Sequence, residues 1–225
     1  MISEVARDAL TDRSYDMLRD RIIDGRLAAG ERLQIARLSA DLGVSQTPVR
    51  EALNRLTSDR LVSLAPYRGF SVAPLLDADN LVQLFEARRV IELGALQVSV
   101  VRATEQDSEE LGLLLDKLDD LAAASQLDIS SFNELDAAFH RATVALCGNT
   151  FLLNAYDDLH IHVQIARHYR SRPVGDARRA QSEHRAILAG FTAGDRDALL
   201  EAASTHISTV CNRLVPTAAD DEKSA

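Results

Sequence analysis

The chain has 225 residues, which exceeds the usual size of one domain, and a formal net charge of −9 at neutral pH. It contains no apolar run long enough to cross a membrane and no basic leader with a cleavage site, so we expect a cytoplasmic protein without a membrane partner. Two cysteines, Cys147 and Cys211, are too few for a disulfide framework, and we expect them to be reduced thiols.

The segment beginning at residue 33 has the pattern of a helix followed by a tight turn. Ile35, Leu38 and Leu42 form one helical stripe. Gly43 then permits a left-handed helix end without a Cβ penalty, and Ser45 can cap the helix that follows. These residues predict two short helices joined at a sharp angle.

The second of these helices is amphipathic. Val49, Leu53 and Leu56 form its apolar face, and Pro48 lies in its first turn. The opposite face carries side chains that can hydrogen-bond base edges or phosphates in a DNA major groove, namely Gln46, Thr47, Arg50 and Asn54, with Ser45 just before them. The composition is that of a DNA recognition helix, although helix-turn-helix shapes also occur in proteins that never contact DNA.

A short hairpin follows the second helix. The runs 61–65 and 69–73 predict two strands around the turn Pro66-Tyr67-Arg68. Arg68 and Gly69 would then lie at the hairpin tip, where an arginine suits a phosphate or a minor groove.

The sequences VSQTPVREALNRL and YRGFSV resemble the winged helix-turn-helix of the GntR superfamily of bacterial transcription factors, and the resemblance extends over residues 11–74. It implies a DNA-binding domain in which the residues named above contact DNA. Arg19 and Arg37 are further candidates, because a domain without bulk positive charge needs locally placed arginines. Each of these arginines could otherwise be an ordinary surface side chain. Gln46 departs from the arginine usual in the family, and because glutamine favours adenine and arginine favours guanine, the operator sequence would differ.

The charge distribution changes after Pro74. The first 74 residues hold 11 basic and 10 acidic side chains, which leaves 14 basic and 24 acidic ones for the remainder. A near-neutral DNA-binding domain must grip phosphates with locally placed arginines rather than with bulk charge. We assign residues 1–74 to the DNA-binding domain, 75–215 to a second domain and 216–225 to a flexible tail.

The second domain reads as helix almost throughout, with breaks near residues 103–104, 125–128, 148–149, 173–176 and 194–195. We expect a mainly α-helical protein, with a winged helix-turn-helix and its small β-hairpin followed by an all-α bundle of about six helices. No glycine-rich phosphate loop or nucleophile elbow is found, so we do not expect an enzyme.

Histidines in the bundle have a spacing that can build a metal site. Asp136 and His140 are four residues apart on one helical face, and His184 and His206 flank the turn at Gly194 at similar heights. Three imidazoles and one carboxylate suit one divalent ion per chain, with zinc as the default and nickel, manganese or iron as alternatives. The same residues could instead be packing groups or a helix-stabilising pair.

The sequences DAAFHRATVALCGN, EHRAILAGFTAGD and ASTHI resemble the ligand-binding domain of the FadR subfamily in its FCD form. The resemblance implies that Asp136, His140, His184 and His206 bind the metal. His160 is a reserve ligand, while His162 and His168 match no metal position and are expected to line the interior or the surface.

The resemblance also implies a small carboxylate-bearing metabolite as effector. Arg88 is the first choice to bind its carboxylate, and an ion pair with Glu92 is an equally good interpretation of that residue. Arg141 and Asn154 are weaker candidates.

We therefore expect a homodimeric DNA-binding regulator, of the repressor type usual in the family, whose two winged helices bind a short palindrome in double-stranded DNA. An apolar stripe on the first bundle helix could face a partner or the core; it comprises Leu84, Val90, Ile91, Ala95 and Val98. The alternatives are a metal-dependent hydrolase and a DNA-binding protein without regulation. The identity of the metabolite and the target genes stay open, as does a purely structural role for the metal.

Overall fold

The computed structural model describes residues 4–168 and 174–215. It divides into two compact units between Leu75 and Leu76. Within the described ranges no helix is both long and apolar enough to span a lipid bilayer. The predicted flexible tail, 216–225, lies outside these ranges, and so does part of the predicted break at 173–176.

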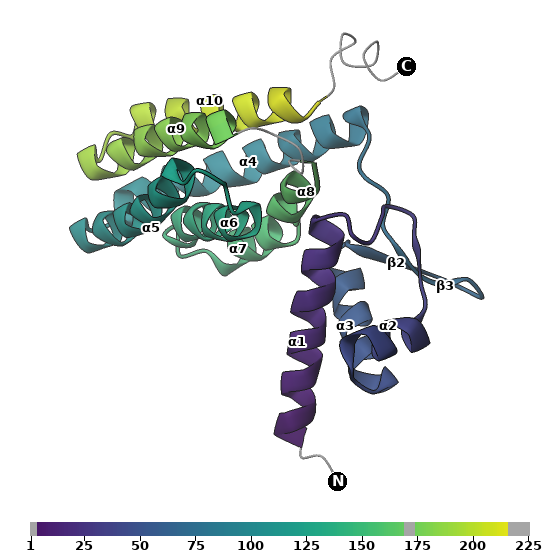
Figure 1. Ribbon diagram of the computed structural model, residues 1–225. Helices are drawn as coiled ribbons and strands as arrows, with labels where there is room; N and C mark the ends of the chain where they lie inside the picture. The colour runs from purple at the N-terminus through teal and green to yellow at the C-terminus, as the bar shows by residue number, and fades with distance from the viewer. Residues whose placement is uncertain (1–3, 169–173, 216–225) are drawn as a thin grey trace. The chain divides into compact units, whose positions relative to one another are not determined.

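The N-terminal unit combines three helices with a small antiparallel sheet (Figure 1). Its helices are α1 (Glu4–Ile23), α2 (Ile35–Leu42) and α3 (Gln46–Ser58), and its strands are β1 (Arg32–Leu33), β2 (Val62–Ala65) and β3 (Gly69–Val72). The order β1-β3-β2 places β3 in the centre, with Phe70 opposite both Leu33 and Leu64. The predicted hairpin is confirmed. Strand β1 was not predicted, because two residues are too few to show alternation.

The turn between α2 and α3 has the predicted geometry at Gly43. Its φ of 67° is left-handed, and its N–H and that of Val44 donate to carbonyls of α2. The prediction that the Ser45 side chain caps α3 was wrong. Ser45 occupies the N-cap position but makes no capping hydrogen bond, and the third residue of the helix is Pro48, which has no N–H to donate. The Ser45 hydroxyl is therefore exposed and unused by the helix.

Seven helices form the second unit within the described residues, one more than expected. They are α4 (Ala78–Arg102), α5 (Glu105–Ala123), α6 (Ile129–Ala145), α7 (Thr150–Asp157), α8 (Ile161–His168), α9 (Val174–Ala193) and α10 (Arg196–Leu214). The extra break lies at residues 158–160, where His160 takes a φ of 48°. No glycine or proline marks this break, so the sequence gives no stop signal there.

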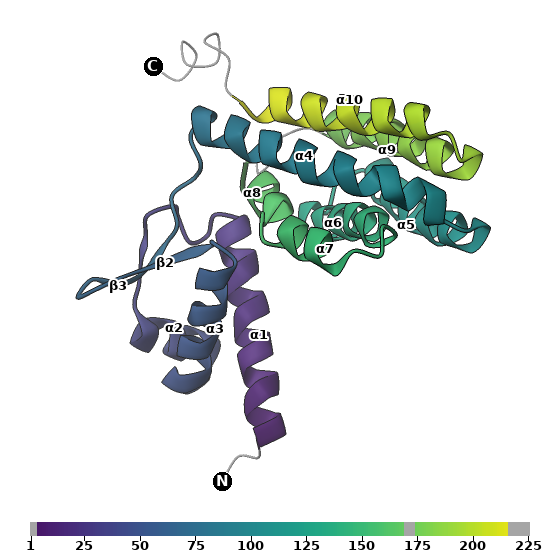
Figure 2. The ribbon, with the colours of Figure 1, turned by 180° about the vertical axis from the view of Figure 1, so that it is seen from behind.

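The bundle is held by long antiparallel pairs. Helices α9 and α10 form a hairpin, α10 lies along α4 in both views, and α5 packs on α6 and α9 (Figures 1 and 2). Gly190 sets the spacing of the α9–α10 hairpin, because a Cβ there would lie 2.7 Å from the Cα of Leu199. This packing brings the inner faces of α4, α6, α9 and α10 together.

Candidate metal centre and nucleic-acid interface

Helix α3 separates its buried and exposed faces cleanly. Val49, Leu53 and Leu56 are completely buried against the rest of the N-terminal unit. The side chains predicted to contact DNA are all exposed; they are Ser45, Gln46, Thr47, Arg50 and Asn54. Gln46, Arg50 and Asn54 follow one another at a spacing of four, which places them along one edge of the helix.

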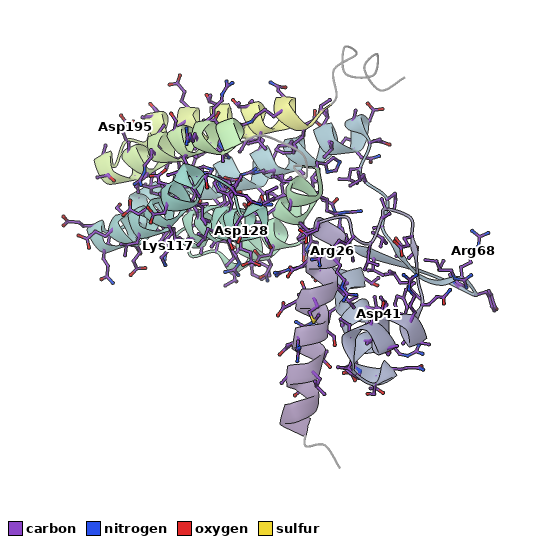
Figure 3. The ribbon with its side chains drawn as sticks, in the orientation of Figure 1. Arg26, Asp41, Arg68, Lys117, Asp128 and Asp195 are labelled. Carbon is purple, nitrogen blue, oxygen red and sulfur yellow. The ribbon has the colours of Figure 1, made fainter. Side chains whose placement is uncertain are left out.

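The wing presents a second exposed arginine. Arg68 lies at the tip of the β2–β3 hairpin, as Figure 3 shows, beside Tyr67 and Gly69, which have φ values of 62° and 76°. Within the described part of the chain, neither Arg50 nor Arg68 has an acidic partner. Both charges are therefore available to an external anion.

The two remaining arginines of the predicted set are partly neutralised. Arg37 lies 3.9 Å from the carboxylate of Asp41, labelled in Figure 3, and Arg19 lies 3.3 Å from Asp20 on α1. Asp41 is one turn from Arg37 on α2 and both side chains are largely exposed, so this pair would open readily toward a phosphate.

In the bundle, the three histidines predicted as metal ligands converge, and Asp136 lies beside two of them. Asp136 and His140 come from α6, His184 from α9 and His206 from α10. The Nε2 atoms of His140 and His184 are 3.2 Å apart, and Asp136 Oδ1 lies 3.2 Å from His184 Nε2. The three histidines each offer a ring nitrogen within 4.8 Å of the others, and their side chains are almost completely buried.

Each of the three imidazoles is held from behind through its Nδ1 atom. His140 Nδ1 lies 3.0 Å from Glu92 Oε1, His184 Nδ1 lies 2.7 Å from Gln181 Oε1, and His206 Nδ1 lies 2.9 Å from Glu183 Oε2. A carboxylate or amide oxygen can only accept, so each Nδ1 carries the proton and each Nε2 carries a lone pair. Metal-binding histidines are usually oriented in this way.

The result is a buried set of acceptors without a shared proton. The lone pairs of His140 and His184 and the Asp136 oxygen approach one point from α6 and α9, and His206 closes the group from α10. Acceptors packed so closely repel one another unless a cation lies between them. The donor set therefore fits a divalent metal of the zinc type.

The pKa values agree with neutral imidazoles. Burial lowers the pKa of both His184 and His206 to about 3. Burial, together with the positive charge of Arg88, also holds the pKa of His140 well below its ordinary value. Burial raises the pKa of Asp136, but the hydrogen bond from His162 and the electrostatic interactions with His140 and His184 together hold that pKa well below its ordinary value.

The role of His162 was not predicted from the sequence. Its Nδ1 lies 3.0 Å from Asp136 Oδ2, and its Nε2 lies 2.8 Å from the hydroxyl of the buried Tyr156. These hydrogen bonds occupy Oδ2 of Asp136, so Oδ1 is the oxygen that faces His184. The reserve ligand His160 does not join the cluster, and His168 bonds instead to the backbone oxygens of Gln164 and Leu76. His160 lies in the unpredicted break before α8, whereas His162 lies on α8 itself and faces Asp136.

Arg88 forms the predicted ion pair with Glu92. It is completely buried and its Nε donates to Glu92 Oε2 at 2.7 Å, which links it through Glu92 to His140. Its Nη2 is also buried and has no hydrogen-bond partner among the described residues. Arg141 and Asn154, in contrast, are exposed, and Arg141 is bound to Asp157 on the surface. The structure does not bring these two to the cluster.

Comparison with known proteins identifies the family. The model of bacterial regulatory proteins of the gntR family matches residues 10–72, and the FCD domain model matches residues 83–209. The chain is a member of the gntR family. It is therefore a DNA-binding transcriptional regulator with an FCD domain and not an enzyme, which confirms the resemblance and rules out the hydrolase alternative.

Several relatives illustrate the family. The Nta operon transcriptional regulator of Aminobacter aminovorans is 35% identical over 61% of this chain and 64% of that protein. The regulator McbR of Escherichia coli K12 is 30% identical over 84% of this chain and 85% of its own, and the solved E. coli McbR/YncC superimposes with a TM-score of 0.75 at 26% identity, covering 95% and 98% of the two chains. The galactonate operon transcriptional repressor of E. coli is 28% identical over 91% of this chain and 96% of its own.

We expect the metal-free regulator to lose stability in mild acid. A histidine with a pKa near 3 in the folded chain and about 6.5 when unfolded binds protons more tightly in the unfolded state. Between these pH values, His184 and His206 should each remove on the order of 1 kcal/mol of unfolding free energy per pH unit. Urea unfolding of chelator-treated protein at a series of pH values measures this loss. A midpoint that stays constant from neutral pH to pH 4 would contradict neutral, buried imidazoles.

Proposed function

We propose that this regulator is a homodimeric repressor whose affinity for operator DNA changes when a small carboxylate-bearing metabolite binds at a divalent metal in the helical bundle. The observation that carries the proposal is the buried group of three histidines, each with a ring nitrogen within 4.8 Å of the others, and Asp136 Oδ1 lying 3.2 Å from His184 Nε2. The N-terminal unit of the same chain would bind the operator DNA.

The proposed DNA contacts are the exposed edge of α3 and the tip of the wing. Arg50 and Asn54 have the reach to hydrogen-bond base edges, and Gln46 prefers adenine among them. Ser45, Thr47, Arg19, Arg37, Arg68 and Gly69 are proposed to contact the DNA backbone or the minor groove. A dimer would place two such helices on the halves of a short palindrome.

Dimerisation is supported by apolar surface on α4. Val90, Val98 and Val101 are 75%, 43% and 80% exposed on this helix. Ala95, from the same predicted stripe, is completely buried in the core. The stripe therefore divides between core and surface, and the exposed valines are the part available to a second copy.

The metal would be held by Asp136, His140, His184 and His206. When bound, a divalent ion supplies positive charge and further coordination positions that a carboxylate or hydroxyl oxygen can occupy. Zinc is the default choice for this donor set. Glu92, Gln181 and Glu183 keep the three imidazoles in the ligating tautomer, and His162 keeps one oxygen of Asp136 directed at the site.

Charge balance favours an anionic ligand. The largely buried side chains at the cluster and behind it include three carboxylates and two guanidinium groups, belonging to Glu92, Asp136, Glu183, Arg88 and Arg213. Arg179, which lies 3.6 Å from Glu183, is 68% exposed to solvent and is not counted. With neutral histidines this sums to one negative charge, so a divalent cation would leave one positive charge in a buried space. A monocarboxylate would neutralise it. The unpartnered Nη2 of Arg88 supplies a hydrogen-bond donor for that carboxylate.

Repression relieved by the metabolite fits this arrangement. A ligand can shift the regulator between two states only if it binds one of them more tightly. A carboxylate in contact with Arg88 would act on α4, the helix that follows the wing. One of the relatives is the galactonate operon transcriptional repressor, and galactonate is a sugar acid. Hydroxylated monocarboxylates are therefore the first class of metabolite to test.

Replacing Arg50 by alanine should weaken specific DNA binding by about 5- to 150-fold, because a bidentate arginine contact to a base contributes about 1–3 kcal/mol. Operator sequences selected from a randomised duplex library provide the probe, and binding is measured by fluorescence anisotropy. Arg26→Ala is the matched control, because Arg26 is an exposed arginine of the same unit that is paired with Asp24. If wild type and Arg50→Ala bound the operator equally well, the assignment of α3 as the recognition helix would be wrong.

Effector binding is tested with zinc-loaded protein and a panel of acetate, lactate and galactonate. We expect at least one of these acids to raise the thermal midpoint of the wild type and to lower its operator affinity. Arg88→Lys keeps a charge beside Glu92 but removes the fork of donors, so it should reduce the response to the acid about tenfold.

Arg141→Lys is the control for this experiment, because Arg141 is exposed and bound to Asp157. It should respond as the wild type does. A zinc-loaded protein that binds operator DNA but ignores every acid in the panel would favour a DNA-binding protein without this regulation. A full response in Arg88→Lys would exclude Arg88 as the carboxylate contact.

A further inference from the structure

The three imidazoles are not held by equivalent partners. His140 and His206 donate to the carboxylates of Glu92 and Glu183, whereas His184 donates to the amide oxygen of Gln181. Gln181 lies one turn before His184 on α9 and is 4% exposed. A carboxylate has two acceptor oxygens and can meet an imidazole N–H with either of them. An amide can present an oxygen or an NH2 group, so its orientation decides which ring nitrogen of His184 is protonated.

The orientation of Gln181 is set by helix α5. The amide Nε2 donates to the backbone oxygen of Leu115 at 3.2 Å and to Asp119 Oδ1 at 3.1 Å. Both partners are pure acceptors when Asp119 is ionised, so only the NH2 end of the amide can face them. The oxygen end must then face His184, where the distance is 2.7 Å.

Asp119 is in turn held at the surface. Arg185 donates to Asp119 Oδ2 through Nε at 3.1 Å and through Nη2 at 2.5 Å. The Asp119 side chain is 43% exposed, whereas His184 is completely buried. A continuous series of hydrogen bonds therefore runs from a surface ion pair through Gln181 to a proposed metal ligand. Helices α5 and α9, which carry these groups, pack along each other.

We propose that Asp119 and Gln181 are positioning residues that fix the tautomer of His184 and so keep its Nε2 free to bind a metal. If the amide of Gln181 turned over, its NH2 group would face Nδ1 of His184. That nitrogen would then accept, the proton would move to Nε2, and Nε2 could not coordinate. This inference rests on the proposed metal site. It makes His184 the proposed ligand whose tautomer depends on hydrogen bonds that extend to the surface of the bundle.

The two aspartates that contact Arg185 provide a matched pair of variants. Asp116 and Asp119 lie one turn apart on α5 and both accept a hydrogen bond from Arg185, but only Asp119 contacts Gln181. Asp119→Ala removes one of the two acceptors that orient the amide and leaves only the backbone oxygen of Leu115. Asp116→Ala removes only a surface ion pair.

Zinc affinity is measured for the full chain by competition with a chromophoric chelator at neutral pH, after circular dichroism has matched the folds. Asp119→Ala should bind zinc about tenfold more weakly, in line with the usual effect of losing a group that orients a metal-binding histidine. Asp116→Ala should stay within about threefold of the wild type. Equal losses in both alanine variants, or no loss in either, would overturn the proposal.

The tautomer of His184 is determined by NMR spectroscopy of the metal-free protein. Histidine 15N chemical shifts should show His184 protonated at Nδ1 in the wild type and in Asp116→Ala, and a mixture of tautomers in Asp119→Ala. An unchanged His184 tautomer in Asp119→Ala would overturn the proposal even if zinc affinity fell. Because this measurement needs no metal, it separates the two ideas: failure of the wild type to bind zinc would reject the proposed function and leave the tautomer test valid.

Discussion

The constraint on which the bundle depends is the direction in which its buried imidazoles donate. Each Nδ1–H of the three histidines meets an oxygen at the rim of the cluster, so the three Nε2 lone pairs are left facing inward. Glu92 comes from α4, His140 from α6, Gln181 and Glu183 from α9, and His206 from α10. Four helices thus depend on one another for the charge and hydrogen-bond balance of a single point. A cation placed there would bind them together, and its loss would leave mutually repelling acceptors in the core.

Helix α4 is the element of the bundle that follows the wing in the chain. Five residues separate its start at Ala78 from the end of β3 at Val72, and its buried Arg88 and Glu92 belong to the hydrogen-bond network of the histidines. A ligand that changes the environment of Arg88 therefore acts on the same rigid helix that follows the wing in the chain. In the proposed dimer, a small displacement of α4 would alter the spacing of two recognition helices, and spacing is what a palindromic site selects.

Local patterns predicted much of this structure. Gly43 marked the turn of the helix-turn-helix, the apolar stripe of α3 placed its buried face, and the distances of His184 and His206 from Gly194 anticipated their convergence. The sequence could not reveal contacts that depend on the register of packed helices. The break before α8 has no glycine or proline, so His162 could not be distinguished from His160. Gln181 and Glu92 were ordinary helical residues until packing placed them behind the histidines. Pro48 removes the N–H of the third helical residue, so only the N–H of Thr47 is left for a Ser45 cap, and that bond is not made.

X-ray absorption spectroscopy of the zinc-loaded protein tests the central claim most directly, because it reports which side chains hold the ion. The donor set predicts about three imidazole nitrogens at ~2.0–2.1 Å with oxygen completing the shell, and one imidazole fewer in His184→Ala. A zinc ion surrounded by oxygen alone, or a spectrum unchanged by His184→Ala, would contradict the account. The three histidines would then be a buried polar cluster with no role as metal ligands, and the basis of effector recognition would have to be sought elsewhere in the bundle.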